Sequence, residues 1–186
     1  MRQLRYSVAM SLDGFIAGPK GEYDWIVHDP AFDFGALFRQ FDTLLMGRRT
    51  FDLAQSQGPL LKSMRMKTVV VSTTLNAAQH KDVTILSGGV AEAVAALKAE
   101  SGKDIWLFGG GVLFRSLLDA GLVDSVELAV SPVLLGGGAR LLPEGRRWPL
   151  RLADCKTMPN SGIVMLKYSV DLSQQPDEMV SGAHEL

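Results

Sequence analysis

Cysteine is scarce in this chain, and long uninterrupted apolar runs are missing. Cys155 is the single cysteine among 186 residues, which excludes an internal disulfide framework and favours a reducing compartment. The longest apolar stretch, residues 105–114, contains three glycines and is far shorter than the roughly 20 residues that a membrane-spanning helix requires. Ser11 and Asp13 interrupt the amino-terminal segment before a secretory signal forms. The sequence therefore predicts a cytoplasmic protein without a membrane partner.

An excess of charge of one sign is also missing. Lysine and arginine number 19 and aspartate and glutamate 20, so the formal net charge is −1. A balanced charge creates no field that would gather nucleic acid or an anionic membrane. We therefore expect no nucleic-acid partner, and an anionic ligand must be bound by a local site.

Motifs of metal and hydrolase chemistry are absent as well. His28, His80 and His184 lack the spacing of a metal site, so no metal is expected. Neither a GxSxG turn nor a cysteine–histidine pattern is present, which argues against a hydrolase.

What the chain does contain is an alternation of strand-like and helix-like segments. This pattern predicts an α/β fold, with a central, mostly parallel sheet, helices on both faces and an antiparallel hairpin at the carboxyl-terminal edge. Residues 1–171 are expected to form one domain and residues 172–186 a flexible tail. The expected strands are residues 6–10, 43–46, 68–71, 83–86, 105–108, 125–133 and 163–170. The expected helices are residues 34–41, 91–99 with Ser87 as N-cap, and 112–118.

Three strand ends carry candidate ligand-binding groups. Residues 46–50 (MGRRT) join a short apolar strand to a helix start, where backbone N–H groups, arginines and a threonine hydroxyl suit an anion. Residues 109–111 are three glycines that lead directly from a buried strand into a helix, which lets a pyrophosphate approach without side-chain interference. Residues 72–74 are hydroxyl side chains at a third strand end. Each element alone is equally typical of an ordinary cap or turn, but an extended dinucleotide requires several of them along one sheet edge.

A set of motifs, in order along residues 3–170, resembles the dihydrofolate-reductase-like family. Within that family, the chain looks most similar to bacterial proteins related to the riboflavin-biosynthesis pyrimidine reductase domain (RibD C-terminal domain). The motifs are residues 9–17 (AMSLDGFIA), 24–25 (DW), 46–50 (MGRRT), 109–111 (GGG) and 131–138 (SPVLLGGG).

The resemblance implies that NADPH is bound across the sheet edge. It implies that residues 47–50 and the Ser72–Thr73 pair hold the adenosine side and its phosphates, and that the glycine turn holds the pyrophosphate and nicotinamide side. Ala9 and Ile16 would flank the nicotinamide. At position 73, where many relatives have a basic residue, this chain has threonine. The preference for NADPH over NADH would therefore depend mainly on Arg48 and Arg49. The full set of expected cofactor-binding residues is Ala9, Ile16, Gly47, Arg48, Arg49, Thr50, Ser72, Thr73, Phe108, Gly109, Gly110, Gly111, Val112 and Leu113.

The expected activity is reduction of a small heterocyclic or imine-like substrate by hydride transfer, most like that of 5-amino-6-(5-phosphoribosylamino)uracil reductase in riboflavin biosynthesis. Asp13 is the first candidate for substrate contact or proton delivery, and the resemblance implies that Glu144 approaches the substrate, although a turn and a solvated loop would explain the two residues equally well. Trp25, Phe51 and Pro132 are the candidate walls of the substrate pocket.

Three alternative functions remain open at this stage. Dihydrofolate reductases carry a carboxylate five residues beyond the tryptophan, where this chain has Pro30, flanked by Asp29 and Asp33. A noncatalytic nucleotide-binding module and a detoxifying reductase of broad specificity are the other two, because a fold does not establish a reaction.

A homodimer is the expected assembly. Residues 125–133 are predicted at a sheet edge, and the apolar residues 133–135 follow them.

Overall fold

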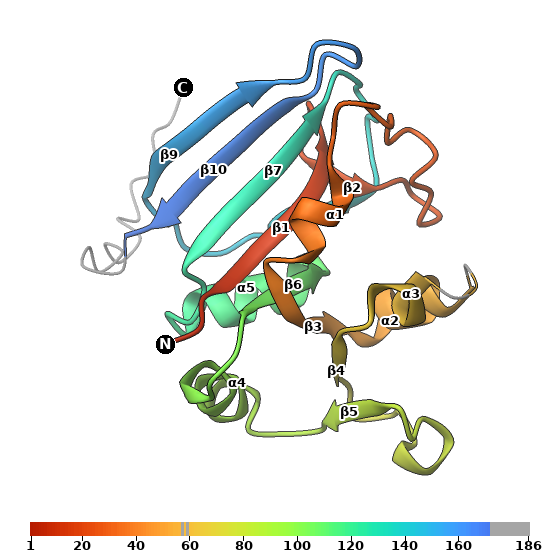
Figure 1. Ribbon diagram of the computed structural model, residues 1–186, viewed down its shortest axis with the longest axis vertical. Helices are drawn as coiled ribbons and strands as arrows, with labels where there is room; N and C mark the ends of the chain where they lie inside the picture. The colour runs from red at the N-terminus through yellow and green to blue at the C-terminus, as the bar shows by residue number, and fades with distance from the viewer. Residues whose placement is uncertain (57, 59, 172–186) are drawn as a thin grey trace, which may run out of the picture.

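One eight-stranded sheet organises the computed structural model, which describes residues 1–56, 58 and 60–171. The strand order is β5-β4-β3-β6-β1-β7-β10-β9, with β5 and β9 at the two edges (Figure 1). The strands of this sheet are β1 (Leu4–Ser11), β3 (Phe41–Gly47), β4 (Lys67–Val71), β5 (Val83–Leu86), β6 (Asp104–Gly109), β7 (Ser125–Ser131), β9 (Leu150–Thr157) and β10 (Val164–Val170). A second, two-stranded sheet pairs β2 (Phe15–Ala17) with β8 (Ala139–Arg140).

The first six strands of this order run parallel to their neighbours, and the carboxyl-terminal strands pair antiparallel, which confirms the predicted fold class. The predicted edge hairpin needs one correction. β7 and β10 do pair antiparallel, but β7 lies between β1 and β10, and the outer strand is β9. All eight residues of β9 are exposed, so its sequence lacks the apolar alternation that reveals a half-buried strand.

Alternate side chains of the central strands enter two separate cores. Leu45, Val69 and Leu107 face a cluster with the helices α4 (Val90–Ala99) and α5 (Gly111–Asp119). Their chain neighbours face the opposite cluster, which lies beside α1 (Phe34–Phe38), α2 (Arg48–Ser56) and α3 (Leu60–Met64). A short 3-10 helix, η1 (Ala77–Gln79), precedes β5. Both faces of the sheet are therefore covered, as the near-continuous apolar strands predict.

Two predicted helix boundaries are wrong. α1 ends at Phe38, and Phe41 belongs to β3 instead of the helix. The helix has only five residues and starts at Asp33, whose carboxylate accepts a hydrogen bond from Ala36 N at 2.8 Å. Ser87 is not the N-cap of α4, because Gly89 occupies that position with a φ of 55° that a glycine tolerates. The helical period of the apolar residues predicted a first helix that continues to residue 41, but that residue pairs with β6 as the first residue of β3.

In the part of the chain that the structure describes, no helix has both the length and the apolarity to cross a bilayer. The predicted tail, residues 172–186, and His184 within it lie outside the described residues.

Candidate functional site

Two helix starts meet at the carboxyl ends of β3 and β6. The two strands are neighbours, with Met46 in register with Gly109, and each runs directly into a helix, α2 at Arg48 and α5 at Gly111. Thr50, in the first turn of α2, packs against the glycine turn: a Cβ placed on Gly109 would lie 3.2 Å from Thr50 Oγ1. Both helices present unpaired N–H groups at one place on the sheet edge, where an extended anion is favoured.

Glycine is required at the start of α5 by close backbone contact. A Cβ on Gly111 would lie 2.5 Å from the carbonyl oxygen of Arg140 and 2.9 Å from that of Leu141. The peptide bond between Gly109 and Gly110 is cis. At Gly47, by contrast, a Cβ would meet no heavy atom within 4 Å, so the space above the start of α2 is open. The residues present therefore fit a phosphate-bearing group at this edge.

The hydroxyl cluster lies beside this edge and directly follows β4, whose last residue, Val71, is in register with Gly47. Ser72 is buried, and its Oγ accepts hydrogen bonds from the N–H groups of Thr74 and Leu75 at 3.2 and 3.0 Å. Thr73 is exposed. The Ser72 hydroxyl also lies 3.4 Å from the Thr74 hydroxyl, at hydrogen-bond distance, so it shapes the turn at the end of β4.

Two arginines stand at the start of α2. Arg48 donates from Nε to both carboxylate oxygens of Asp52 at 2.7 Å, one helical turn along. Arg49 is exposed and has no ion-pair or hydrogen-bond partner among the residues described. Both guanidinium groups are thus accessible to an anion near the helix start.

A loop and a small sheet cover the edge near β1. Asp13 connects this loop to the segment after β7: its carboxylate accepts hydrogen bonds from Ser11 Oγ at 2.7 Å, Leu135 N at 3.0 Å and Gly136 N at 2.7 Å. The Ser11 hydroxyl, followed by these two N–H groups, lowers the pKa of Asp13 to about 2. These hydrogen bonds make Asp13 an anchor between the two loops, and its role in substrate contact or proton delivery stays a prediction.

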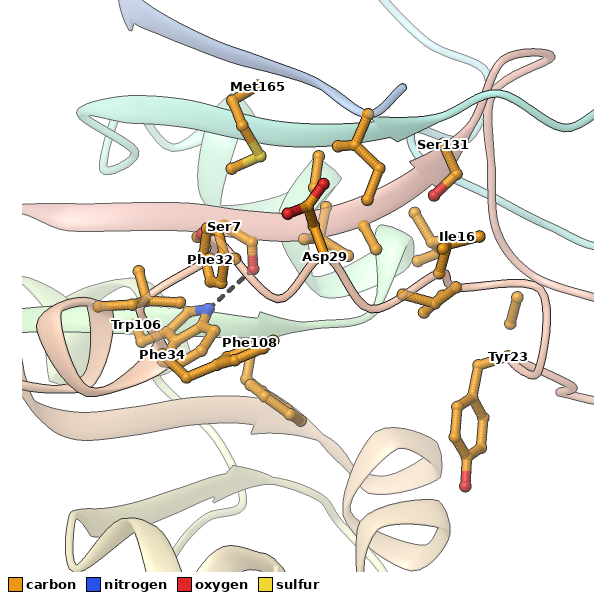
Figure 2. Close-up of a pocket in the computed structure, with 18 of the residues that line it drawn as sticks. Ser7, Ile16, Tyr23, Asp29, Phe32, Phe34, Trp106, Phe108, Ser131 and Met165 are labelled. Carbon is orange, nitrogen blue, oxygen red and sulfur yellow. Dashed lines mark hydrogen bonds between the residues drawn. The ribbon is translucent and has the colours of Figure 1, made fainter. Parts of the chain in front are cut away.

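A cavity of about 510 Å³ opens on the face of the sheet that carries α1 and α2 (Figure 2). Four of the residues that the sequence analysis expects to bind the cofactor line this cavity: Ala9, Ile16, Thr50 and Phe108. Five aromatic rings form what we call the aromatic wall of the cavity. They touch in sequence, with centroid distances of 4.7, 6.0, 5.9 and 5.3 Å, and are Phe32, Phe34, Phe38, Trp106 and Phe108.

Asp29 is the single charged residue among the described residues that line this cavity. Burial opposes its ionisation, but hydrogen bonds from Ala31 N and from Asn160 and Ser161 outweigh this and hold the pKa of Asp29 well below its usual range. The two partners on the turn between β9 and β10 donate from backbone and side chain alike, at 2.8 to 3.2 Å. The carboxylate thus connects the segment between β2 and α1, which we call the covering loop, to the turn between β9 and β10. Few of its lone pairs remain for a ligand.

The three predicted substrate-pocket residues do not line the cavity. Phe51 is fully buried in the core and meets His80 edge-on, because α2 turns it toward the sheet. Trp25 donates its indole N–H to the carbonyl of Glu22, and Pro132 is exposed beside the turn at Gly162. The structure therefore does not bring these three residues together at this cavity, and their role toward a substrate stays a prediction.

Three further predicted residues differ in placement. Glu144 is exposed and does not line the cavity. Leu113 is buried in the core between α5 and the sheet, which leaves no surface for a cofactor. Val112, one residue earlier, is 76% exposed at the start of α5 and is accessible from the glycine turn.

Sequence reasoning missed most of the cavity lining. Phe34 and Phe38 belong to the predicted helix 34–41, and no role was predicted for Phe32, since a single sequence does not distinguish a core from a cavity wall. Met165 on β10 and Ser131 on β7 also line the cavity. The only sequence signal that could have identified them is the alternation of side chains between the two faces of a strand. Within the described residues, no group of three histidine, cysteine, aspartate or glutamate side chains is placed to hold a metal ion.

Comparison with known proteins gives a consistent family assignment. The model of the RibD C-terminal domain matches residues 2–164. YyaP of Bacillus subtilis (strain 168), itself an uncharacterized protein, is 35% identical over 179 residues, which cover 90% of this chain and 94% of YyaP.

Solved structures share the fold. A putative riboflavin biosynthesis protein from Shewanella sp. PV-4 is 26% identical, with a TM-score of 0.76 over 92% of this chain and 99% of that one. A diaminohydroxyphosphoribosylaminopyrimidine deaminase/5-amino-6-(5-phosphoribosylamino)uracil reductase from Thermotoga maritima is 14% identical, with a TM-score of 0.69 over 91% of this chain and 57% of that one. Dihydrofolate reductase from Enterococcus faecalis, complexed with NADP(H) and RAB-propyl, is 20% identical, with a TM-score of 0.62 over 90% and 94% of the two chains.

Proposed function

Because the chain belongs to the RibD C-terminal domain family, we propose that it is an NADPH-dependent oxidoreductase that reduces a small heterocyclic or imine-like substrate. The observation that carries the proposal is the meeting of two helix starts, at Arg48 and Gly111, beside an aromatic cavity. The helix starts suit the phosphates of a dinucleotide, and the cavity suits its nicotinamide together with a flat substrate.

The division of labour follows from this arrangement. Bound NADPH supplies the hydride, and the protein holds the acceptor carbon close to the nicotinamide and excludes water. Ala9 and Ile16 line the cavity near the glycine turn and are proposed to contact the nicotinamide. Reduction of a C=N or C=O group also needs a proton, and we do not assign it to Asp13, whose carboxylate is engaged by Ser11, Leu135 and Gly136. A proton from solvent is consistent with a cavity whose one carboxylate is already saturated.

The alternatives differ in what favours them. A folate substrate requires a free carboxylate for the pterin, and the carboxylate of Asp29 is occupied by Ala31, Asn160 and Ser161. Dihydrofolate reduction is therefore the weaker candidate. A noncatalytic nucleotide-binding module predicts NADPH binding without turnover, and a detoxifying reductase predicts slow turnover of many unrelated acceptors.

Titration of the purified protein with NADPH and NADH, followed by nicotinamide fluorescence, tests the cofactor. NADPH is expected to bind more tightly, and Arg48→Ala is expected to weaken it by about five- to tenfold, because one charge-assisted hydrogen bond is lost while the ion pair with Asp52 already competes for the guanidinium. Lys103→Ala, which removes an exposed cation at the amino end of β6, away from the helix starts at the carboxyl ends of the strands, is the control. If neither nucleotide binds, the reductase proposal is wrong.

We also propose that the chain forms a homodimer, in the cytoplasm, through the edge strand β9. Leu150 and Leu152 are 42% and 54% exposed on one face of this strand, and its outer edge is unpaired. β7 is paired on both sides, so the interface expected there is relocated to β9. Light scattering at micromolar concentration is expected to give a dimer mass for the wild type and a monomer mass for Leu152→Lys. A monomer mass for the wild type would contradict the assembly.

A further inference from the structure

The lining of the cavity constrains the chemistry of its ligand. None of the described residues that line it is lysine, arginine or histidine, and its single carboxylate, that of Asp29, is saturated by hydrogen bonds. A phosphate group carries a charge of about −1.5 to −2 at neutral pH, and burial of such a charge without a cation is strongly unfavourable. The cavity is therefore poorly suited to a phosphorylated substrate.

The aromatic wall favours a flat ligand. Its five rings, from Phe32 to Phe108, form one continuous surface along the cavity. Met158 and Met165 add adaptable apolar surface to the lining. Aromatic rings favour the stacking of a flat ligand, and an apolar lining with few polar groups is typical of sites for small neutral molecules.

One hydroxyl of this lining is fully buried and has no partner among the described residues. Ser131 is fully buried, and its Oγ makes no hydrogen bond with any described residue. Figure 2 shows its hydroxyl pointing from β7 into the cavity that it lines. The neighbouring Ser11, in register with Ser131, uses its own hydroxyl on Asp13 and Phe15. A buried hydroxyl without a partner is unfavourable in the empty cavity, and a ligand with one polar group restores its hydrogen bond.

We infer that the substrate is a flat, uncharged aromatic or heteroaromatic molecule without a phosphate group, held by the aromatic wall and by one hydrogen bond to Ser131. This inference rests on the proposed reductase function and narrows its substrate class. It separates the chain from an enzyme whose substrate carries a ribosyl phosphate, such as the one for which the Thermotoga maritima protein is named.

Direct binding of three naphthalene probes to the cofactor-free protein tests the inference. 2-Naphthol is neutral and carries one hydroxyl, 2-naphthyl phosphate has the same rings with a phosphate, and 2-methylnaphthalene has no hydrogen-bonding group. Probe fluorescence is expected to show that 2-naphthol binds at least about tenfold more tightly than 2-naphthyl phosphate, since the charged group is left unpaired. Ala129→Leu, which fills the cavity beside Ser131, is expected to weaken both neutral probes.

Two variants at Ser131 test the hydrogen bond. Ser131→Ala is expected to weaken 2-naphthol by about three- to tenfold and to leave 2-methylnaphthalene within about twofold, while Ser131→Thr, which keeps a hydroxyl, is expected to retain 2-naphthol. Equal or tighter binding of 2-naphthyl phosphate, no binding of 2-naphthol, or equal loss of both neutral probes in Ser131→Ala would overturn the inference. Because the probes are titrated without cofactor, failure of NADPH to bind overturns the reductase proposal separately.

Discussion

Gly47→Val is expected to abolish most NADPH binding and to leave the fold intact. A Cβ at Gly47 meets no heavy atom within 4 Å, and the residue ends a strand, where a β-branched side chain is tolerated. The new side chain occupies the open space over the start of α2, through which a phosphate must reach the N–H groups. Loss of several charge-assisted hydrogen bonds at once predicts an affinity lower by about a hundredfold. Gly47→Ala is expected to have a smaller effect in the same direction.

Nicotinamide fluorescence measures this effect, and two controls make the result specific. The Tm of Gly47→Val is expected to match the wild type within a few degrees, and 2-naphthol is expected to bind it normally, because Gly47 does not line the cavity. Unchanged NADPH affinity in a folded variant would place the cofactor elsewhere and would remove the anion site at α2 from the mechanism.

Asp29→Ala is expected to lower the Tm by about 5–10 °C. The carboxylate is buried and accepts hydrogen bonds from Ala31, Asn160 and Ser161. Its removal leaves these donors without a partner and separates the covering loop from the turn between β9 and β10. Asp33→Ala is the matched control, since Asp33 is exposed, caps the short helix α1 and forms only an exposed ion pair with Arg39 besides. Its expected loss is about 1–3 °C.

The stability contributed by Asp29 depends on pH in a defined direction. Its pKa in the folded protein lies below the ordinary value of about 3.9 that it has in the unfolded chain. Stability from such a group is fully present above the unfolded pKa and is lost as the pH falls through the folded pKa. The Tm difference between wild type and Asp29→Ala is therefore expected to be complete at pH 7 and pH 5 and to narrow below about pH 4. A difference independent of pH, or no larger than that of Asp33→Ala, would contradict the role of Asp29 as a charged anchor.

Local patterns in the sequence were sufficient to predict the alternating layers and the two glycine turns that lead into helices at the sheet edge. Val69, Leu45 and Leu107 belong to apolar runs bounded by turns, and the glycines at 47 and 109–111 follow such runs directly. A buried strand and a helix start are local features, because apolar content, glycine and capping chemistry act within a few residues. The same local information missed β9, whose exposed side chains on both faces leave no period to detect.

The substrate side depended on the tertiary structure. Phe51 looked like a pocket wall and is core, whereas Phe34 looked like core and lines the cavity. Composition and periodicity distinguish apolar from polar positions, but they do not state whether the space beyond an apolar residue is filled. That space depends on strands brought together from distant parts of the chain, as are Asp29 and Ser161, or Asp13 and Leu135. The family and the glycine-bearing helix starts at the sheet edge are thus determined by short segments of the sequence. The shape of the cavity, the absence of cationic side chains from its described lining and the buried Ser131 hydroxyl arise only when the sheet assembles.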